Sequence, residues 1–409
     1  MSMPPAADAS SQCQVHASSV RPIKVLHVLG GMDRGGAETW LMHMLRRLNP
    51  KCVQFDFLVH TARECAYDAE ILATGSRIYR IPGHSNPLQY GRSLTECLRA
   101  NGPYDVVHSH VHLFSGNVLR IAHKSGVPTL IAHGHSARSS SSADTRIGRR
   151  VYGAVAQHWL RRYATHKIAV SPAAAAHLYG AKWSSDRTLA VAPCAIDLNP
   201  FGKQVDRLAI RAQLGLQDSD FVVGHVGRFD AAKNQAFLLA IHRELLKQNP
   251  SSRLLLIGTG PLWHQLRTSA EQTGIADTVR FTGARSDIPE LMLGAMDVFV
   301  MPSMHEGLGL AAVEAQAAGL PAIVSENMPQ EVNVGSGLLR FISLSDSPAH
   351  WADAICQHAT TYVSQQAALN QVRGSCFDIE VNAARQLAYY GAHSALFPKD
   401  STWSCAFSK

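Results

Sequence analysis

The sequence predicts an α/β protein with two doubly wound, Rossmann-like domains that face a cleft, and three observations support this prediction. Short β-type runs alternate with stretches of helical spacing, which is typical of βαβ units and a parallel sheet. The alternation is interrupted by a proline- and glycine-containing segment over residues 193–202 and then begins again. The chain has 409 residues, enough for two or three domains of roughly 150 residues each. Sheets of this kind bind ligands in a crevice at the carboxyl ends of their strands.

The first half of the chain begins its pattern with a β-type run followed by a glycine-rich loop over residues 30–36. A helix is expected next, over Ala37–Leu48, because its apolar residues share one face. Further β-type runs follow at regular intervals. The strands expected in this half are 24–29, 55–59, 105–108, 129–132, 167–170 and 188–192.

The second half repeats the pattern, and glycines follow its first two strands. Gly227 follows the first of these strands, and Gly258-Thr259-Gly260 follows the second. An amphipathic helix is expected near the end of the chain, over residues 377–390. The strands expected here are 221–226, 253–257, 279–281, 298–300 and 321–324.

These patterns divide the chain into four parts. We predict a flexible tail over residues 1–21, a first domain over 22–198, a second domain over 199–375, and a C-terminal helix over 376–398 that crosses back to the first domain. The tail is polar and lacks the apolar stretch of a secretory signal.

The composition narrows the class of protein. An apolar fraction of 46% and a charged fraction of 17% are ordinary for a globular enzyme. No apolar run approaches the ~18 residues of a membrane span. The net charge is +7, but no basic motif with interleaved aromatic residues appears, so nucleic acid is not an expected partner. Eight scattered cysteines without metal-like spacing suggest reduced thiols in a cytoplasmic protein.

The segment from His305 to Pro321 suggests an anion or sugar site. A strand ends near Met301, a glycine-containing turn follows, and a helix is expected to begin about Leu308, where backbone N–H groups suit phosphate or sugar oxygens. Glu306 lies in the turn and Glu314 about two helical turns later, so both carboxylates can face the same cleft. One could hold sugar hydroxyls and the other a ribose diol. The structural alternative is a solvated helix residue at Glu314 and a charge favoured by the helix dipole at Glu306.

Two cations follow the first strand of the second half. Arg228 and Lys233 lie where a diphosphate would need its charge neutralised, and stabilising a departing diphosphate lowers the barrier to transfer of its sugar. A surface pair of charged side chains is the alternative interpretation.

The combined motifs resemble family 4 glycosyltransferases of the GT-B fold, over roughly residues 22–395. Bacterial exopolysaccharide and capsule enzymes are the most similar members, because of Gly-Gly-Ala-Glu-Thr at 35–39 and Ile-Ala-His-Gly-His-Ser at 131–136. Cys194 and Ala195 depart from the asparagine and glycine that the family usually has in its linker. The motifs that carry the resemblance are Gly227-Arg228 with Lys233-Asn234, Gly258-Thr-Gly260, Phe281-Thr-Gly283, Gly35-Gly-Ala-Glu38 and the two glutamates eight residues apart.

The resemblance implies a role for each matching residue in the second domain. Arg228 and Lys233 would bind the donor diphosphate, Glu306 would contact the transferred sugar, and Glu314 would hold the ribose. Backbone atoms around Arg285 to Ile288 would recognise the base. The backbone N–H groups that would bind sugar hydroxyls or phosphate belong to Gly307, Leu308, Gly309 and Leu310.

In the first, acceptor-side domain, the resemblance implies that Gly35 and Gly36 let a loop approach the donor phosphate closely, because a Cβ would obstruct the approach. His135, or else His133, would lie near the reacting anomeric carbon. The other candidates are His108, His110 and His112.

The resemblance also implies the reaction, which is transfer of a hexose with retention of anomeric configuration. A phosphate oxygen of the donor would assist the acceptor hydroxyl on the same face, so His135 would be a hydrogen-bond partner and need not be a general base. No D-x-D motif appears where metal-dependent enzymes hold an ion, so no metal or other cofactor is expected. The expected partners are a UDP- or GDP-sugar and a glycan or lipid-linked acceptor.

Three other functions are compared with this one. A dehydrogenase is disfavoured because no strand ends in G-x-G-x-x-G with an acidic residue about 20 positions later. A sugar-nucleotide epimerase of the same fold, and a non-catalytic nucleotide-sugar scaffold, remain as alternatives.

A basic stretch over residues 146–162 could dock peripherally on anionic lipid at the inner face of the cell membrane, or could be a solvated helix face.

Overall fold

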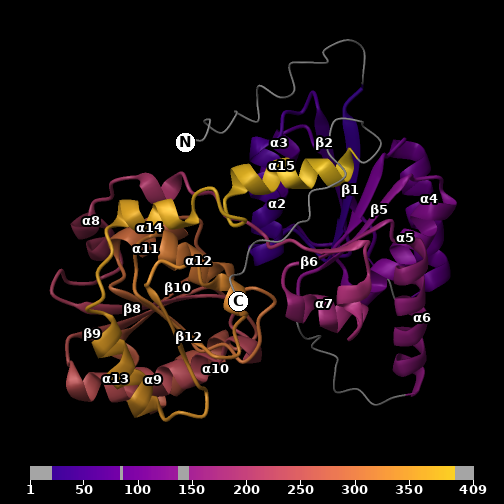
Figure 1. Cartoon of the computed structure of the whole chain (residues 1–409). Helices are drawn as coiled ribbons and strands as arrows, with labels where there is room; N and C mark the ends of the chain where they lie inside the picture. The colour runs from indigo at the N-terminus through magenta and orange to yellow at the C-terminus, as the bar shows by residue number, and fades with distance from the viewer. Residues whose placement is uncertain (1–20, 83–85, 137–146, 392–409) are drawn as a thin grey trace. The chain divides into compact units, whose positions relative to one another are not determined.

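The computed structural model describes residues 21–82, 86–136 and 147–391, except for the side chains of 147–150 (Figure 1). The chain separates into two compact units. The first comprises Met1–Cys194 with Ile379–Lys409, and the second comprises Ala195–Asp378. Each unit is described by itself below.

The first unit is built on a parallel sheet of seven strands in the order β3-β2-β1-β4-β5-β6-β7. The strand β1 has β2 on one side and β4 on the other, so the chain changes direction across the sheet between β1 and β4. The strands are β1 (Ile23–Leu29), β2 (Val53–Val59), β3 (Ile78–Arg80), β4 (Val106–Ser109), β5 (Thr129–Gly134), β6 (His166–Ala169) and β7 (Leu189–Val191).

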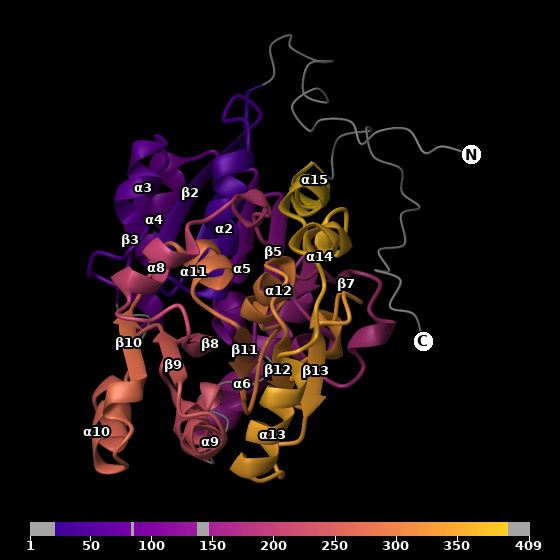
Figure 2. The same cartoon turned by 90° about the vertical axis from the view of Figure 1, so that its left-hand side faces the viewer.

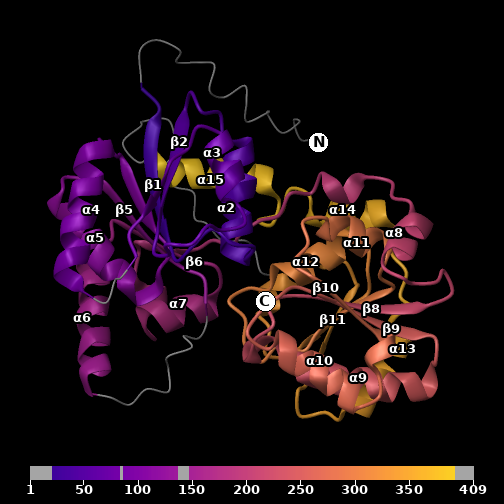
Figure 3. The ribbon, with the colours of Figure 1, turned by 180° about the vertical axis from the view of Figure 1, so that it is seen from behind.

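Alternation along these strands assigns side chains to two faces of the sheet. Leu26 and Val28 of β1 join the apolar core formed with α4 (Pro87–Asn101), α5 (Ser115–Lys124), α6 (Ile147–Tyr163) and α7 (Pro172–Tyr179). His27, between them, faces the other way. That second face is covered by α2 (Gly36–Arg47) and α15 (Ile379–Tyr390), which lie side by side in Figures 1 and 3. The short helix α3 (Asp68–Ala73) follows β2.

The second unit has a parallel sheet of six strands in the order β10-β9-β8-β11-β12-β13. Its change of direction lies between β8 and β11, which are neighbours in this sheet. The strands are β8 (Phe221–Val226), β9 (Ser252–Ile257), β10 (Val279–Gly283), β11 (Val298–Met301), β12 (Ala322–Ser325) and β13 (Leu339–Ile342).

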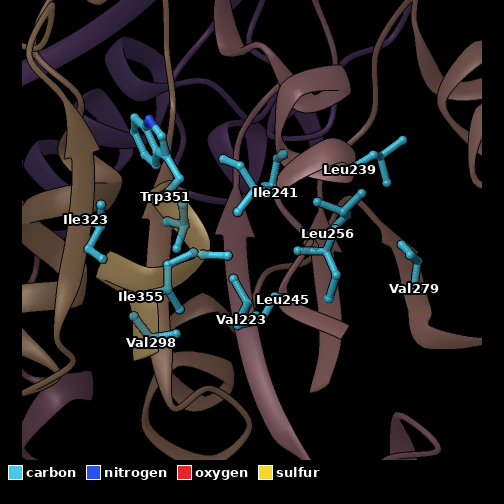
Figure 4. Packing of buried hydrophobic residues seen from close by; sticks show 14 of the residues in the cluster. Val223, Leu239, Ile241, Leu245, Leu256, Val279, Val298, Ile323, Trp351 and Ile355 are labelled. Carbon is cyan, nitrogen blue, oxygen red and sulfur yellow. The ribbon is translucent and has the colours of Figure 1, made fainter. Parts of the chain in front are cut away.

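Helices cover both faces of the second sheet (Figure 2). One face packs against α9 (Gln235–Gln248), α10 (Trp263–Gln272) and α13 (Pro348–His358). Figure 4 shows this core, in which Trp351 and Ile355 of α13 lie near Val223 and Ile241. The other helices are α8 (Arg207–Gln213), α11 (Ile288–Gly294), α12 (Leu310–Ala317) and α14 (Gln365–Val372).

The structure corrects several details predicted from the sequence. The edge strands β3 and β13 were not predicted, because each is short and gives little alternation from which to recognise it. The prediction of reduced thiols is wrong for Cys52, which is disulfide-bonded. The free cysteines among the described residues are Cys65, Cys97, Cys194, Cys356 and Cys376. None of the helices in the described part of the chain is long and apolar enough to cross a bilayer.

Candidate functional site

The two loops that carry Lys233 and Glu306 meet at the carboxyl end of the second sheet. Lys233 ends the 3₁₀ turn Ala231–Lys233 after β8, and Glu306 follows β11. The backbone N–H of Met304 donates to the carbonyl of Ala232 at 2.7 Å, which ties the loops together. Since β8 and β11 flank the point where the strand order reverses, this is the position at which ligands bind in doubly wound sheets.

Lys233 and Glu306 form an ion pair. The Lys233 ammonium donates to Oε1 of Glu306 at 2.5 Å, and the two side chains are 20% and 9% exposed. The structure therefore brings together two residues that were predicted to share a site, although 73 positions separate them. Each group neutralises the charge of the other.

Glycines allow the neighbouring loops to approach this pair. Gly258 has a φ of +137°, and a Cβ placed on it would lie 2.0 Å from the carbonyl oxygen of Gly227. A Cβ on Gly260 would lie 2.3 Å from the carbonyl oxygen of Phe229. The Phe229 N–H donates to the carbonyl of Thr259 at 2.9 Å. The glycines of this motif are thus explained by close packing of the loops after β8 and β9.

The helix α12 begins at Leu310, two residues after the predicted start about Leu308. Gly309 is its N-cap and has a left-handed conformation, with φ 93° and ψ 54°, which cannot continue a right-handed helix. Leu308 is buried and precedes this turn, and Gly307 is half-buried. The first N–H groups of a helix have no acceptor within it, so the start of α12 offers donors to an anion or to sugar hydroxyls.

Glu314 lies inside α12 and is half-buried. Desolvation by burial raises the pKa of its carboxyl group to about 7. No described residue forms a hydrogen bond or an ion pair with this carboxylate. A desolvated carboxyl group without a partner is an unusual feature that favours a ligand-binding role.

The remaining predicted residues of the second unit differ in how firmly they are held. Arg228 is 70% exposed, and its nearest acidic group, on Asp230, is 4.0 Å away. Arg285 makes two hydrogen bonds to the carboxylate of Asp287, at 2.8 and 2.5 Å, and Ile288 is the first residue of α11. The Arg228 side chain is therefore available to a ligand, whereas that of Arg285 is engaged within its own loop.

In the first unit, Gly36 is the first residue of α2 and Gly35 its N-cap, so the expectation that Gly36 lies in the loop is wrong. A Cβ on Gly35 would lie 2.4 Å from Oε2 of Glu38. Because the N-cap is a glycine, no side chain caps the first N–H groups of α2.

Five histidines gather on the face of the first sheet that α2 and α15 cover. We call them the imidazole cluster: His27 of β1, His108 and His110 of β4 and the loop after it, and His133 and His135 of β5 and the loop after it. Nδ1 of His27 lies 3.0 Å from Nε2 of His110, and Nδ1 of His110 lies 2.8 Å from Nε2 of His135. Nε2 of His108 lies 3.2 Å from Nδ1 of His133.

Aromatic residues of α2 and α15 border the imidazole cluster, and Phe55 and Phe57 of β2 pack on its His27. The Trp40 ring of α2 contacts His133 edge-on, with centroids 5.3 Å apart. The hydroxyl group of Tyr390 in α15 lies 3.1 Å from Nδ1 of His108. His112, in contrast, packs against His177 with centroids 5.0 Å apart.

Burial keeps the cluster uncharged at neutral pH. It lowers the pKa of His27 and of His135 to about 3. It also lowers the pKa values of His108, His110 and His133 well below the usual value, and the neighbouring imidazoles add to this effect. A neutral imidazole has one N–H donor and one acceptor nitrogen, so each ring can both donate and accept.

The cluster was not predicted from the sequence, in which the histidines were considered as separate candidates. A signal was present, because His108 and His110, and likewise His133 and His135, are two residues apart at the ends of predicted strands. Side chains two positions apart on a strand share a face.

Comparison with known families assigns both halves of the chain. The family described as "Glycosyl transferases group 1" matches residues 206–362, and the "Glycosyl transferase 4-like domain" matches residues 35–194. These segments contain the whole of the second sheet and all strands of the first except β1. The fold and the matched families define the class of protein as a glycosyltransferase of the GT-B type.

Individual relatives agree with this class. EpsF of Bacillus subtilis (strain 168), provisionally named as a glycosyltransferase, is 37% identical over 341 residues, which cover 82% of this chain and 88% of EpsF. The Escherichia coli enzyme "UDP-Gal:alpha-D-GlcNAc-diphosphoundecaprenol alpha-1,3-galactosyltransferase" is 30% identical over 233 residues, or 54% of this chain and 58% of that protein. The chain belongs to the family 4 glycosyltransferases.

A solved structure agrees with the fold. HepE of Anabaena, crystallised with UDP-glucose, superposes with a TM-score of 0.74 at 20% identity, covering 91% of this chain and 100% of HepE. At this identity, the similarity bears on the two-domain fold alone.

Proposed function

We propose that this glycosyltransferase moves a hexose, with retention of anomeric configuration, from a UDP- or GDP-sugar to a growing glycan or lipid-linked acceptor of an exopolysaccharide type. The observation that carries the proposal is the Lys233–Glu306 pair at the strand-order reversal of the second sheet. A UDP donor is favoured by HepE, which was crystallised with UDP-glucose, and by the galactosyltransferase, whose name specifies UDP-Gal.

In this proposal, donor binding rearranges the ion pair. The diphosphate accepts hydrogen bonds from Lys233 and from the exposed Arg228, and this positive charge stabilises the departing nucleoside diphosphate. Glu306, released from the lysine, accepts hydrogen bonds from hydroxyls of the transferred sugar. Glu314 accepts hydrogen bonds from the ribose diol, and the N–H groups of Gly307, Leu308, Gly309 and Leu310 bind sugar or phosphate oxygens. Backbone atoms between Arg285 and Ile288 hold the base.

The first unit supplies a hydrogen-bond partner and not a strong base. We assign this role to His135, which is half-buried, whereas His133 is 1% exposed. An imidazole with a pKa of about 3 is a weak proton acceptor, so a donor phosphate oxygen takes the proton of the acceptor hydroxyl in this scheme. Gly35 and Gly36 contribute the uncapped N–H groups at the start of α2 to the donor phosphate.

The diphosphate is neutralised without a divalent ion in this scheme, because Lys233 and Arg228 supply the positive charge. Nucleoside diphosphate affinity should therefore be the same with added Mg²⁺ and with none. A strict requirement for the ion would contradict this part of the proposal.

A lipid-linked acceptor would require contact with a membrane surface, and α6 has a suitable composition. Val151, Tyr152 and Val155 expose 58%, 42% and 37% of their surface, and Arg161 and Arg162 follow on the same helix as exposed residues. Exposed apolar residues beside cations favour anionic lipid. Arg146 and the side chains of Arg149 and Arg150 lie outside the described residues. Lys167 does not contribute, since it is buried and bonded to Asp186 at 2.8 Å.

Vesicle sedimentation tests the membrane contact. The protein should sediment with anionic vesicles and not with neutral ones, and salt should release it, because screening weakens attraction to lipid headgroups. The double variant Val151→Asp, Val155→Asp should sediment less. Equal binding to both vesicles would contradict the contact.

The experiment for the main proposal is a thermal-shift screen of the purified protein against UDP, GDP, ADP, CMP and their sugars, with and without metal. One nucleoside diphosphate should raise the melting temperature, and the variant Arg228→Ala, Lys233→Ala should lose that shift. Hydrolysis of the matching donor would then separate an enzyme from a scaffold. An anomeric NMR assignment of the product would separate retention from inversion. No shift with any nucleotide would refute the donor site.

A further inference from the structure

The proposed donor chemistry uses one histidine and does not explain why five lie together. Within the imidazole cluster, His110, His133 and His135 can each offer a ring nitrogen within 4.8 Å of the other two. His27, His108 and His110 form a second such group. Three imidazole nitrogens this close are the ligand set of several three-histidine zinc sites.

We propose that His110, His133 and His135 bind one divalent ion of the zinc class, through Nδ1 of His110 and Nε2 of the other two. Zinc–nitrogen bonds are ~2.0–2.1 Å, so two ligand nitrogens on a tetrahedral ion lie about 3.3 Å apart. A hydrogen bond joins Nδ1 of His110 and Nε2 of His135 at 2.8 Å. When both nitrogens bind the ion, the ring that donates this bond keeps its proton on its other nitrogen, so each ligand remains a neutral imidazole. A small separation of the two rings accommodates the ion.

The second nitrogen of each proposed ligand already has a partner. Nε2 of His110 meets His27 at 3.0 Å, Nδ1 of His133 meets His108 at 3.2 Å, and Nδ1 of His135 lies 3.7 Å from Sγ of Cys194. Metal-binding histidines almost always have such a partner, because it sets the ring orientation and the tautomer. His108 is held in turn by Tyr390.

Each of the two groups contains a buried nitrogen without a hydrogen-bond partner, which is costly for a polar atom. It is Nε2 of His133 in the proposed site and Nε2 of His27 in the second group, and a bound ion would satisfy it. Access favours the proposed site over the second group, because His110 and His135 are half-buried, whereas His27 and His108 are fully buried.

The ligand set selects the ion. Imidazole nitrogens suit Zn²⁺, Cu²⁺ and Ni²⁺, whereas Mg²⁺ and Mn²⁺ prefer the oxygens of carboxylates and phosphates. The three protein ligands leave a fourth position for water or an oxygen ligand. The site is therefore separate from diphosphate neutralisation by Lys233 and Arg228. It shares His135 with the proposed function, and with the ion bound, its fourth ligand position takes the place of the hydrogen bond assigned to that residue.

Metal titration of untagged, full-length protein tests the site. After removal of metal with a chelator and dialysis, the protein should bind one equivalent of Zn²⁺ in competition with a chromophoric chelator. Co²⁺ in place of Zn²⁺ should give the visible absorption bands of a tetrahedral ion. The single variants His110→Gln, His133→Gln and His135→Gln should each weaken Zn²⁺ binding by at least about 10-fold.

His242→Gln is the matched control, because His242 is a buried histidine of the second unit, bonded to Thr278 at 3.0 Å. It should bind Zn²⁺ like the wild type. If His133→Gln does not fold, as judged by circular dichroism, the test uses the His135→Gln variant, because His135 is half-buried. Absence of stoichiometric binding by the wild type, or unchanged affinity in all three cluster variants, would overturn the proposal. The thermal shift with a nucleoside diphosphate is measured separately, so either proposal can fail without the other.

Discussion

At the residue scale, Lys233 and Glu306 determine how the second unit can receive a donor. Their side chains come from loops after two adjacent strands and neutralise each other at 2.5 Å. Arg228 is exposed beside the same turn, so it adds positive charge without first breaking a close contact. The binding energy of a diphosphate must therefore exceed what the Lys233–Glu306 contact loses.

Substitution of Lys233 tests this arrangement. In Lys233→Met, nucleoside diphosphate affinity should fall about ten-fold or more, because a hydrogen bond to a charged group contributes about 1.5–3 kcal/mol. Isothermal titration calorimetry measures the change. Lys247→Met is the control, since Lys247 pairs with Glu244 on the exposed side of α9 and should bind nucleotide normally. Equal affinity in the two variants would contradict the role of Lys233.

The raised pKa of Glu314 predicts a pH-dependent cost to stability. Its pKa is about 7 in the folded protein and 4.5 in its ordinary state, so the folded protein holds a proton that the unfolded chain releases. The ionised carboxylate thus destabilises the fold fully above pH 7, and this penalty disappears as the pH falls to 4.5. Glu314→Gln removes the penalty.

At pH 8, Glu314→Gln should therefore raise the free energy of unfolding by about 1–3 kcal/mol, and the gain should shrink towards pH 5. Urea denaturation at both pH values measures it. The same variant should bind nucleoside diphosphate more weakly at pH 8, since an amide is a poorer acceptor for the ribose diol. A pH-independent effect on stability would show that burial does not control this carboxyl group.

At the element scale, the start of α12 depends on one glycine. Gly309 has a φ of 93°, and a Cβ on it would lie 2.2 Å from Cε of Met328. Both features are properties of the turn between β11 and α12. They place the first N–H groups of the helix after a buried Leu308 and next to Glu306.

Gly309→Ala should destabilise the protein more than Gly335→Ala. Gly335 has a φ of 76°, but no atom lies within 4 Å of the position that a Cβ would take, so alanine there costs only the backbone strain of about 1–2 kcal/mol. At Gly309 the contact with Met328 adds to that cost. Thermal unfolding compares the two variants, and nucleotide affinity should fall only in Gly309→Ala. Equal destabilisation would mean that Met328 moves aside freely.

At the scale of the whole molecule, the end of the chain completes the first unit. Trp40 of α2 donates its indole N–H to Oδ1 of Asn382 in α15 at 2.7 Å, and the amide group of Asn382 donates to the carbonyl of Pro193 at 2.9 Å. Tyr390 of the same helix contacts His108. Residues far apart in the sequence thus cover the imidazole cluster.

Asn382→Ala should destabilise the first unit by about 1–3 kcal/mol, because it leaves two buried polar groups without partners. Hydrogen exchange measured by mass spectrometry over β1 and β4 should become faster. Asn370→Ala, on the exposed surface of α14, is the control and should change little. Unchanged exchange in Asn382→Ala would show that α15 contributes little to this core.

Much of the fold could be predicted from local pattern. The strands of both sheets, apart from β3 and β13, follow from β-type runs separated by helical spacing. The helix α15 was predicted within two residues of its start. The start of α12 was also predicted within two residues, and the left-handed turn at Gly309 that delays it is a property of backbone conformation that residue type alone does not specify.

The sequence by itself determined the two α/β halves, the glycines of the turns and the eight-residue spacing of Glu306 and Glu314, because these depend on neighbours along the chain. Only the tertiary structure decided that Lys233 contacts Glu306 and that five histidines form one cluster. The contact of Lys233 with Glu306 requires β8 and β11 to be neighbours in the second sheet. The histidine cluster requires β1, β4 and β5 to be consecutive strands of the first sheet. The physical reason is that strand order depends on how helices pack over each sheet, and residues separated by tens of positions meet only after that packing is complete.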